Sequence, residues 1–285
     1  MKDVHRGILW MLLTAMLFVS MDTIGKYLTQ SYPVFQVTWA RFFFHALWLL
    51  VFLRWRIISV VRTQRLGLQI SRGFYMLAAN TFFVAGVSMM PLVETHSILL
   101  LSPLLATALS VPLLGERVGL RRWSCIAAGF MGALIIIRPG LGVMQMAALF
   151  PLGAACSYAL YQIATRQLSH SDPPLTTLFY TVAVGVPVTT LAMPFIWQAP
   201  DLYGWMLMAG MGLLGSISHF TLIKAFSAAP VAVVAPFNYT NLIWATVFGF
   251  IIFTELPDFW TLFGALIIIS SSLYAFAREQ RLQSS

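Results

Sequence analysis

The feature that most constrains this chain is an internal repeat. Residues 91–116 reappear as residues 230–255, displaced by 139 positions without a gap, and each copy runs from a proline through a long apolar stretch to a glutamate. The same displacement places Asn80 on His219. Repeats of about 20–50 residues would indicate a solenoid or a propeller. One period of about half the chain instead indicates two fused, related halves, as in duplicated membrane proteins.

Composition places both halves in a lipid bilayer. Apolar residues make up 59% of the chain and charged residues 9%, with a mean hydropathy of +0.84, whereas soluble domains carry roughly 25% charged residues. Ten apolar stretches can cross about 30 Å of hydrocarbon as helices, although two of them are short. They are 8–27, 34–53, 73–89, 95–114, 123–137, 146–165, 175–196, 205–225, 231–254 and 260–276. We therefore expect an all-α integral membrane protein with ten transmembrane helices in two halves, at residues 1–142 and 143–285.

Five spans in each half make the repeat an inverted one. An odd number of crossings forces the two halves to enter the membrane in opposite directions, so Glu116 and its counterpart Glu255 end helices on opposite sides. The halves are then related by a two-fold axis in the membrane plane. Such 5+5 inverted repeats bind their ligands near mid-membrane, at the interface between the halves.

The basic residues predict the orientation of the helices. With a cytoplasmic amino terminus, 14 of the 17 basic residues fall in cytoplasmic segments, and the positive-inside rule then places both termini in the cytoplasm. These 14 are Lys2, Arg6, Arg54, Arg56, Arg62, Arg65, Arg72, Arg117, Arg121, Arg122, Arg166, Lys224, Arg278 and Arg281. Basic loops facing anionic lipid explain the net charge of +8, so membrane lipid is the expected partner and nucleic acid is not.

Four segments carry a resemblance to a known family. They are WARFFFHAL, LLGERVGLRRWSCIAAGFMGALIIIRPG, KAFSAAPVAVVAPF and FTELPDFWTLFGALIIISSSLYAF. Together they resemble the drug/metabolite transporter superfamily, specifically its EamA-type members. The pair Arg72-Gly73, the motif MPLVET and LLGERVG followed by RRW are most similar to bacterial riboflavin and S-adenosylmethionine importers, and amino-acid exporters are more distant.

The resemblance implies a multi-pass carrier of the bacterial inner membrane, not an enzyme, without a cofactor. Such a carrier moves a small organic metabolite by alternating access through a central cavity lined mainly by helices 1, 3, 4, 6, 8 and 9. A two-half carrier is complete as a monomer, and a dimer is left open.

Polar residues at mid-membrane depth are candidates for the cavity lining. Asn80 and His219 form one symmetry-related pair, and Ser102 and Asn241 form another. A polar group that faced lipid at this depth would cost several kcal/mol. All four should therefore face either the cavity or a neighbouring helix, where small polar residues often form hydrogen bonds.

Aromatic and amide side chains extend this expected lining. Tyr158, Tyr161 and Gln162 follow i, i+3, i+4 spacing and can share one helix face. The other candidates are His96, Asn238 and Tyr239, beside Asn241. Such a lining suits a planar or zwitterionic metabolite such as an amino acid or a vitamin better than a sugar phosphate. The aromatic residues could equally serve packing or anchor the interface.

Charged residues within the apolar stretches predict an ion pair. Asp22 and Arg41 are almost equidistant from the turn near residues 31 and 32, and Lys26 lies four residues after Asp22. A carboxylate at this depth is costly unless it is paired, so we expect Asp22 to pair with Arg41 or with Lys26. The pair could fix two helices together or act as an outer gate. His219 is the leading candidate among the histidines for coupling transport to protons.

Other functional classes fit less well. A membrane prenyltransferase would need clustered acidic residues for metal and pyrophosphate, and the nine acidic residues are scattered, without metal-ligand spacing. A retinal-type receptor could use Lys224, but ten spans and an inverted duplication argue against it. A passive channel shares this composition and stays an alternative, which trans-acceleration of exchange would distinguish from a carrier.

Overall fold

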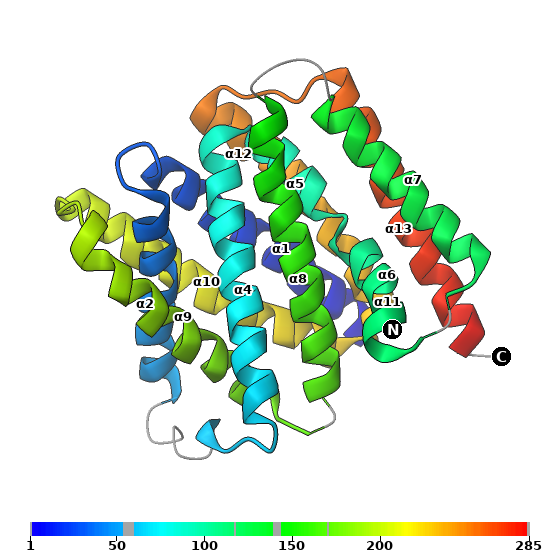
Figure 1. Cartoon of the computed structure of the whole chain (residues 1–285), viewed down its shortest axis with the longest axis horizontal. Helices are drawn as coiled ribbons and strands as arrows, with labels where there is room; N and C mark the ends of the chain where they lie inside the picture. Colours follow the sequence, from blue (N-terminus) through cyan, green and yellow to red (C-terminus); the bar gives the residue numbers. More distant parts are fainter. Residues whose placement is uncertain (1, 54–59, 117, 139–143, 170, 284–285) are drawn as a thin grey trace.

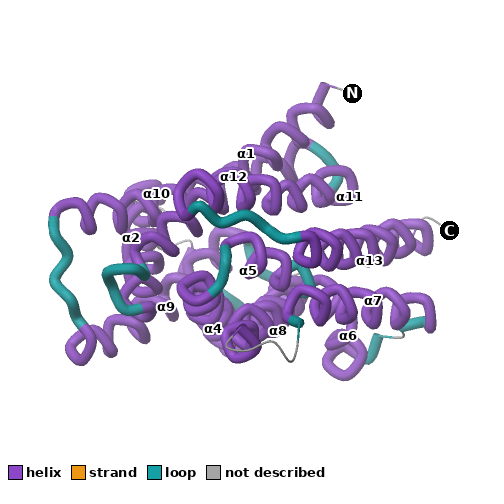
Figure 2. Tube along the Cα trace, turned by 90° about the horizontal axis from the view of Figure 1, so that it is seen from above, coloured by secondary structure: helices purple, strands orange, loops and turns teal. Residues whose placement is uncertain are grey.

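The computed structural model describes residues 2–53, 60–116, 118–138, 144–169 and 171–283, and these form helices without any strand (Figures 1 and 2). In chain order the helices are α1 (Lys2–Leu28), α2 (Val34–Leu53), α4 (Leu66–Met89), α5 (Leu92–Leu99), α6 (Ser102–Leu114), α7 (Leu120–Ile137), α8 (Met144–Leu168), α9 (Pro174–Ile196), α10 (Leu202–Ala228), α11 (Val231–Val234), the 3-10 helix η2 (Ala235–Thr240), α12 (Asn241–Phe253) and α13 (Phe259–Gln283).

Nine helical spans among the described residues are long and apolar enough to cross a membrane. The tenth is α4, which has 24 residues but carries buried polar side chains at Gln69, Arg72 and Asn80 that lower its hydropathy. The sequence placed the start of this span at residue 73, whereas α4 begins at Leu66. Arg72 is therefore a residue of the helix. The sequence prediction had counted it among the basic residues of the cytoplasmic segments, outside the helix.

The fourth and ninth predicted spans are broken helices. The fourth divides into α5 and α6, and the ninth into α11, η2 and α12. Pro103 and Pro236 lie in the first turns of α6 and η2, where a missing backbone N–H removes no helical hydrogen bond. The sequence predicted the stretches 95–114 and 231–254, which contain these prolines, as continuous helices, and the structure divides both of them.

The displacement of 139 residues reappears in the backbone. Helices α6 and α12 begin and end at equivalent positions. Each is followed by a residue with left-handed dihedral angles, Gly115 with φ of 68° and Thr254 with φ of 59°. A threonine rarely adopts this conformation, so its presence at the equivalent position indicates that the helix end itself is repeated.

The two halves interlock as an inverted repeat requires. The first helix of each half packs on the third helix of the other, α1 on α10 and α8 on α4. Likewise α2 packs on α10 and α9 on α4, while α7 and α13 pair with each other at one side of the bundle (Figures 1 and 2). A Cβ added to Gly132 of α7 would lie 2.7 Å from the carbonyl oxygen of Gly264 in α13. Close backbone approach at small residues is typical of helix pairs in membranes.

Hydrogen bonds between connections define the two ends of the bundle. At the Glu255 end, where α1, α4, α7, α9 and α12 end, Gln36 donates to the Gln198 carbonyl at 2.7 Å and accepts from its N–H at 2.9 Å. At the Glu116 end, which holds the connections after α2, α6, α8 and α10, Asp172 accepts from Thr63 at 2.5 Å and Gln69 at 2.7 Å. Burial opposes ionisation of Asp172, yet these hydrogen bonds hold its pKa below the ordinary value.

Candidate functional site

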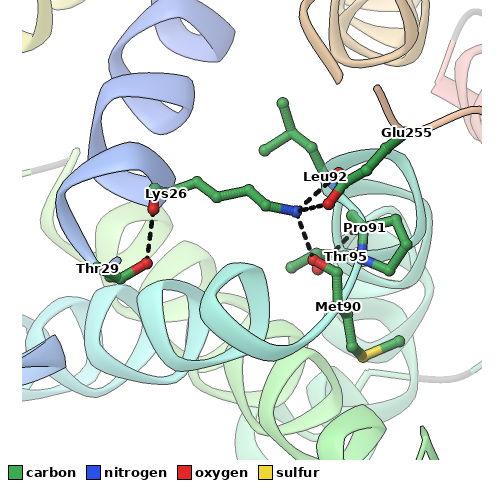
Figure 3. A network of polar contacts seen from close by, with 7 residues as sticks. All are labelled: Lys26, Thr29, Met90, Pro91, Leu92, Thr95 and Glu255. Carbon is green, nitrogen blue, oxygen red and sulfur yellow. Dashed lines mark hydrogen bonds and ion pairs between the residues drawn. The ribbon is translucent and has the colours of Figure 1, made fainter. Parts of the chain in front are cut away.

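A buried ion pair joins the two halves at the Glu255 end. The Lys26 ammonium of α1 donates to both Glu255 carboxylate oxygens, at 2.5 and 2.7 Å, and to the Met90 carbonyl at 2.9 Å (Figure 3). Glu255 also accepts from the N–H of Leu92 at 3.1 Å. These contacts connect α1, the α4–α5 connection and the segment after α12. The Lys26 side chain is 9% exposed and that of Glu255 25%.

The inverted repeat supplies a related pair at the opposite end. Arg166 of α8 lies 2.9 Å from Glu116, which follows α6. Glu116 is displaced from Glu255 by 139 residues and Lys26 from Arg166 by 140. The Arg166 and Glu116 side chains are 59% and 33% exposed, so the two equivalent pairs differ mainly in the burial of their cations.

A pocket lies beside each of these pairs. The pocket at the Glu255 end has a volume of about 450 Å³ and is lined by Lys26, Thr29, Gln30, Ser88 and Glu255, among others. The pocket at the Glu116 end has a volume of about 250 Å³ and extends to Gln162, one of the predicted lining residues.

The predicted Asp22–Arg41 pair is present. Arg41 Nη1 lies 2.8 Å from Asp22 Oδ1, whereas the alternative pairing of Asp22 with Lys26 is wrong, because Lys26 binds Glu255. Nε2 of His96 lies 3.5 Å from Asp22 Oδ2 without making a hydrogen bond to any described residue. Its ring packs edge-on against Phe83, with ring centroids 5.0 Å apart.

Two histidines stack between α2 and α10. The rings of His45 and His219 are 5.2 Å apart and nearly parallel, and Phe18 packs edge-on against His219. Asn80, the counterpart of His219, donates to the Met76 carbonyl of its own helix at 3.1 Å. The equivalent positions therefore hold side chains in different surroundings, and Asn80 makes the bond within one helix rather than between helices.

A buried arginine that the sequence did not predict as a site residue lies in α4. Arg72 is 3% exposed and donates to the hydroxyls of Thr165, Thr181 and Tyr161 and to the Thr177 carbonyl, at 2.6–2.9 Å. Its guanidinium lies over the Tyr161 ring, at 4.3 Å from the centroid. None of the ion pairs formed by the described residues includes Arg72. A polar face through Gln69 and Arg72 could have indicated that the helix begins early.

The remaining predicted residues form three local contacts. Tyr158 stacks on Tyr161 with ring centroids 5.4 Å apart. Gln162 donates to the Ser102 hydroxyl at 3.4 Å, across α8 and α6. Asn241 donates to Asn238 at 3.3 Å, next to Tyr239 of η2, and its own carbonyl oxygen is buried without a partner among the described residues.

These groups lie within electrostatic reach of one another. Arg41 and Arg72 both act on His219 and on Tyr158. The site therefore combines two cations, one compensated by Asp22, with the flat faces of a tyrosine pair and a histidine pair. Such a set can bind a carboxylate by charge and a planar ring by stacking.

The comparisons with known proteins agree with this architecture. The sequence model of the EamA-like transporter family matches residues 5–138 and again residues 145–277. The chain is 30% identical over 284 residues to the S-adenosylmethionine uptake transporter of Rickettsia bellii, covering 100% of this chain and 98% of that protein.

More distant relatives also match over nearly their whole length. The chain is 28% identical over 271 residues to the riboflavin transporter of Vibrio cholerae, covering 93% of this chain and 91% of that protein. One solved crystal structure shares the fold with a TM-score of 0.65 at 18% identity, over 97% of this chain and 98% of that one. This chain is a multi-pass membrane protein that belongs to the EamA-like transporter family.

Proposed function

We propose that this protein is a secondary transporter that moves a small organic metabolite by alternating access between its two halves. The observation that supports this proposal is the unequal burial of two equivalent ion pairs. The Lys26 side chain is 9% exposed and that of Arg166 59%, whereas Glu255 and Glu116, at 25% and 33%, are both partly exposed. A carrier closed at one end and open at the other would have this asymmetry.

In the proposed mechanism the two ends of the helix bundle close alternately, each through its own ion pair. In this conformation Lys26 holds α1 against the segments before α5 and after α12, so the Glu255 end is closed. Opening breaks this pair, and the halves rock until Arg166 and Glu116 become the buried pair. The breaks between α5 and α6 and between η2 and α12 supply the flex points, because the chain bends there without breaking a continuous helix.

The substrate class follows from the composition of the site. The Tyr158–Tyr161 and His45–His219 faces suit a planar ring, and Arg72, which has no carboxylate partner among the described residues, suits a carboxylate. A zwitterionic or aromatic metabolite combines these features. S-adenosylmethionine has both a purine ring and an amino-acid group, and riboflavin has a flat ring, so these two compounds are the first to test.

Orientation follows from charge. At the Glu116 end lie Arg62 and Arg65, before α4, and Arg121 and Arg122, in the first turn of α7; by the positive-inside rule these basic residues support a cytoplasmic position for this end and for both termini. The membrane is then the bacterial inner membrane, and one chain with both halves is a sufficient transport unit. The proposed boundary between the halves, at residues 142 and 143, lies outside the described residues.

Thermal unfolding and transport test this function. S-adenosylmethionine, riboflavin and individual amino acids are added to the purified protein, and a ligand that binds the folded state raises the Tm. A compound that does so is then tested in proteoliposomes, where a carrier exchanges labelled for unlabelled substrate. Uptake that neither saturates nor shows trans-acceleration would indicate a channel, and the absence of both binding and uptake for every compound would contradict the proposed substrate class.

Asp22→Asn separates a structural role of the Asp22–Arg41 pair from a gating role. A gate requires the carboxylate during the transport cycle, so the variant should be produced and bind substrate but fail to transport it. Asp201→Asn is the matched control, because Asp201 caps α10 by accepting from the Gly204 N–H at 2.7 Å and is exposed. Transport by Asp22→Asn at the wild-type rate would exclude the gating role.

A further inference from the structure

A cluster of five ionisable groups beside α5, at the Glu255 end, contains three carboxyl groups but two cations. Lys26 pairs with Glu255, and Arg138 at the end of α7 pairs with Asp258 before α13. The fifth ionisable group is Glu94, in the first turn of α5. It is 8% exposed and forms no ion pair with the described residues.

The surroundings of Glu94 do not compensate a negative charge. One oxygen, Oε1, accepts a long contact of 3.5 Å from the Thr261 hydroxyl. The other oxygen, Oε2, is buried without a hydrogen-bond partner among the described residues. An ionised carboxylate buried in this way costs several kcal/mol. With a proton on Glu94 the five groups sum to zero charge, and without it they sum to −1.

We propose that Glu94 is a proton-binding site, occupied while the Lys26–Glu255 pair is formed and emptied when that pair opens. Lys26 and Glu94 already interact electrostatically. When Lys26 leaves Glu255, its free ammonium stabilises a Glu94 carboxylate. The O–H bond of the carboxyl group then breaks, and the proton passes to water in the pocket that Lys26 and Glu255 line.

The connection between the two groups is direct along the chain. The N–H of Leu92, which begins α5, donates to Glu255 at 3.1 Å, and Glu94 follows two residues later. Opening of the pair therefore releases the start of the helix that carries Glu94. This coupling needs the opening that the proposed function describes, whereas proton binding in the closed conformation does not.

The other charged groups around α5 do not offer an alternative proton-binding site. Besides Lys26, the charged groups that act on Glu94 are Asp258, Arg138 and Glu255, and Asp258 and Arg138 already pair with each other. His96, on the same helix, faces the Asp22–Arg41 pair instead. Among the other helices that pack on α5, α12 has no ionisable residue, and α8 places Arg166 at the opposite end.

Infrared spectroscopy tests the proton directly. The purified protein at neutral pH should show the carbonyl stretch of one protonated carboxylic acid, which shifts in D₂O. Glu94→Gln, which has the same shape as the protonated acid, should lose this band while unfolding cooperatively. Glu116→Gln is the matched control and should retain the band, because Glu116 is a partly exposed carboxylate that is paired with Arg166.

A second variant tests the coupling to the gate. Glu255→Gln leaves Lys26 without its carboxylate, so Lys26 should turn to Glu94 and the band should disappear although Glu94 is present. A wild-type protein without the band would overturn the proton site, and so would a band that persists in Glu94→Gln. A band that persists in Glu255→Gln would overturn the coupling. If Glu94→Gln does not fold, the wild-type spectrum still tests the proton site, and the spectrum of Glu255→Gln still tests the coupling.

The infrared result is independent of the substrate. A protein that shows the band but neither binds nor transports any tested metabolite would contradict the proposed function and leave the proton site standing. A protein that transports S-adenosylmethionine but lacks the band would contradict the proton site alone.

Discussion

Replacement of Lys26 by methionine should open the Glu255 end of the protein. The ammonium makes three close contacts, with both Glu255 oxygens and the Met90 carbonyl, and is 9% exposed. Loss of one partner from a buried pair costs about 3–5 kcal/mol. Glu255 is 25% exposed and keeps the Leu92 N–H, so water recovers part of this cost. We expect the closed state to lose about 2 kcal/mol.

Hydrogen–deuterium exchange measures this loss without a substrate. Local exchange follows the free energy of local opening, and 1.4 kcal/mol is a factor of ten, so amides in residues 89–95 and 251–257 should exchange about 30-fold faster. Arg166→Met is the matched control at the equivalent position. Its pair has one contact, at 2.9 Å, and is exposed, so residues 111–116 should exchange less than about fivefold faster, as expected for a surface pair.

Two outcomes would refute this reasoning. Equal, small increases in the two variants would mean that burial does not distinguish the pairs. Faster exchange at residues 111–116 but not at residues 89–95 in Lys26→Met would mean that the pair does not close the end where it lies.

The remaining predictions concern packing and pH. Gly132→Ala and Gly264→Ala should each lower the stability of the α7–α13 pair by about 1–3 kcal/mol, because each added Cβ would lie 2.5–2.7 Å from the opposing carbonyl oxygen. Gly210→Ala, with nothing within 4 Å of its Cβ, should leave the Tm unchanged or higher. The hydrogen bond from its arginine partner lowers the pKa of Asp258 to about 2, so this carboxylate stabilises the fold above about pH 4. That stabilisation should disappear between about pH 4 and pH 2, and Asp258→Asn should remove it, a difference of no more than about 1 kcal/mol because the pair is partly exposed. In proteoliposomes, His219→Gln should retain the full pH dependence of transport, and its loss would assign the proton to the histidine stack instead.

The repeat predicted helix ends where both copies have the same residue at the boundary, and it missed helix ends that no repeated residue accompanies. Helices α6 and α12 follow the displacement of 139 residues at both ends. The repeated glutamate marks their common end, whereas no repeated residue indicated that they begin at Ser102 and Asn241. Hydropathy continues unchanged from residue 95 to residue 114, so it could not reveal the break between α5 and α6. A hydropathy scan also began the third span only after Arg72, since only a packed interior accepts an arginine inside a membrane helix.

The site was predicted where partners are near in sequence. Asp22 and Arg41 could be paired from their equal distance to one turn. Lys26 and Glu255 are separated by 229 residues and belong to different halves, so no local spacing indicates their contact. The repeat relates the two contacts, because Lys26 and Glu255 are the counterparts of Arg166 and Glu116. It can predict one of these contacts only when the other is already known.

One difference between the two halves makes the balance between the two proposed conformations depend on pH. Val233 occupies the position equivalent to Glu94 in the second half, so the proposed proton site exists at the Glu255 end only. A proton that binds while the Lys26–Glu255 pair is closed stabilises that closed state by linkage. Acid on the Glu255 side therefore favours the conformation that is open at the Glu116 end, and alkali favours its opposite. At equal pH on both sides a matching carboxyl at each end would bias both states equally, so this one residue makes the two-fold symmetric protein respond to the pH on the Glu255 side.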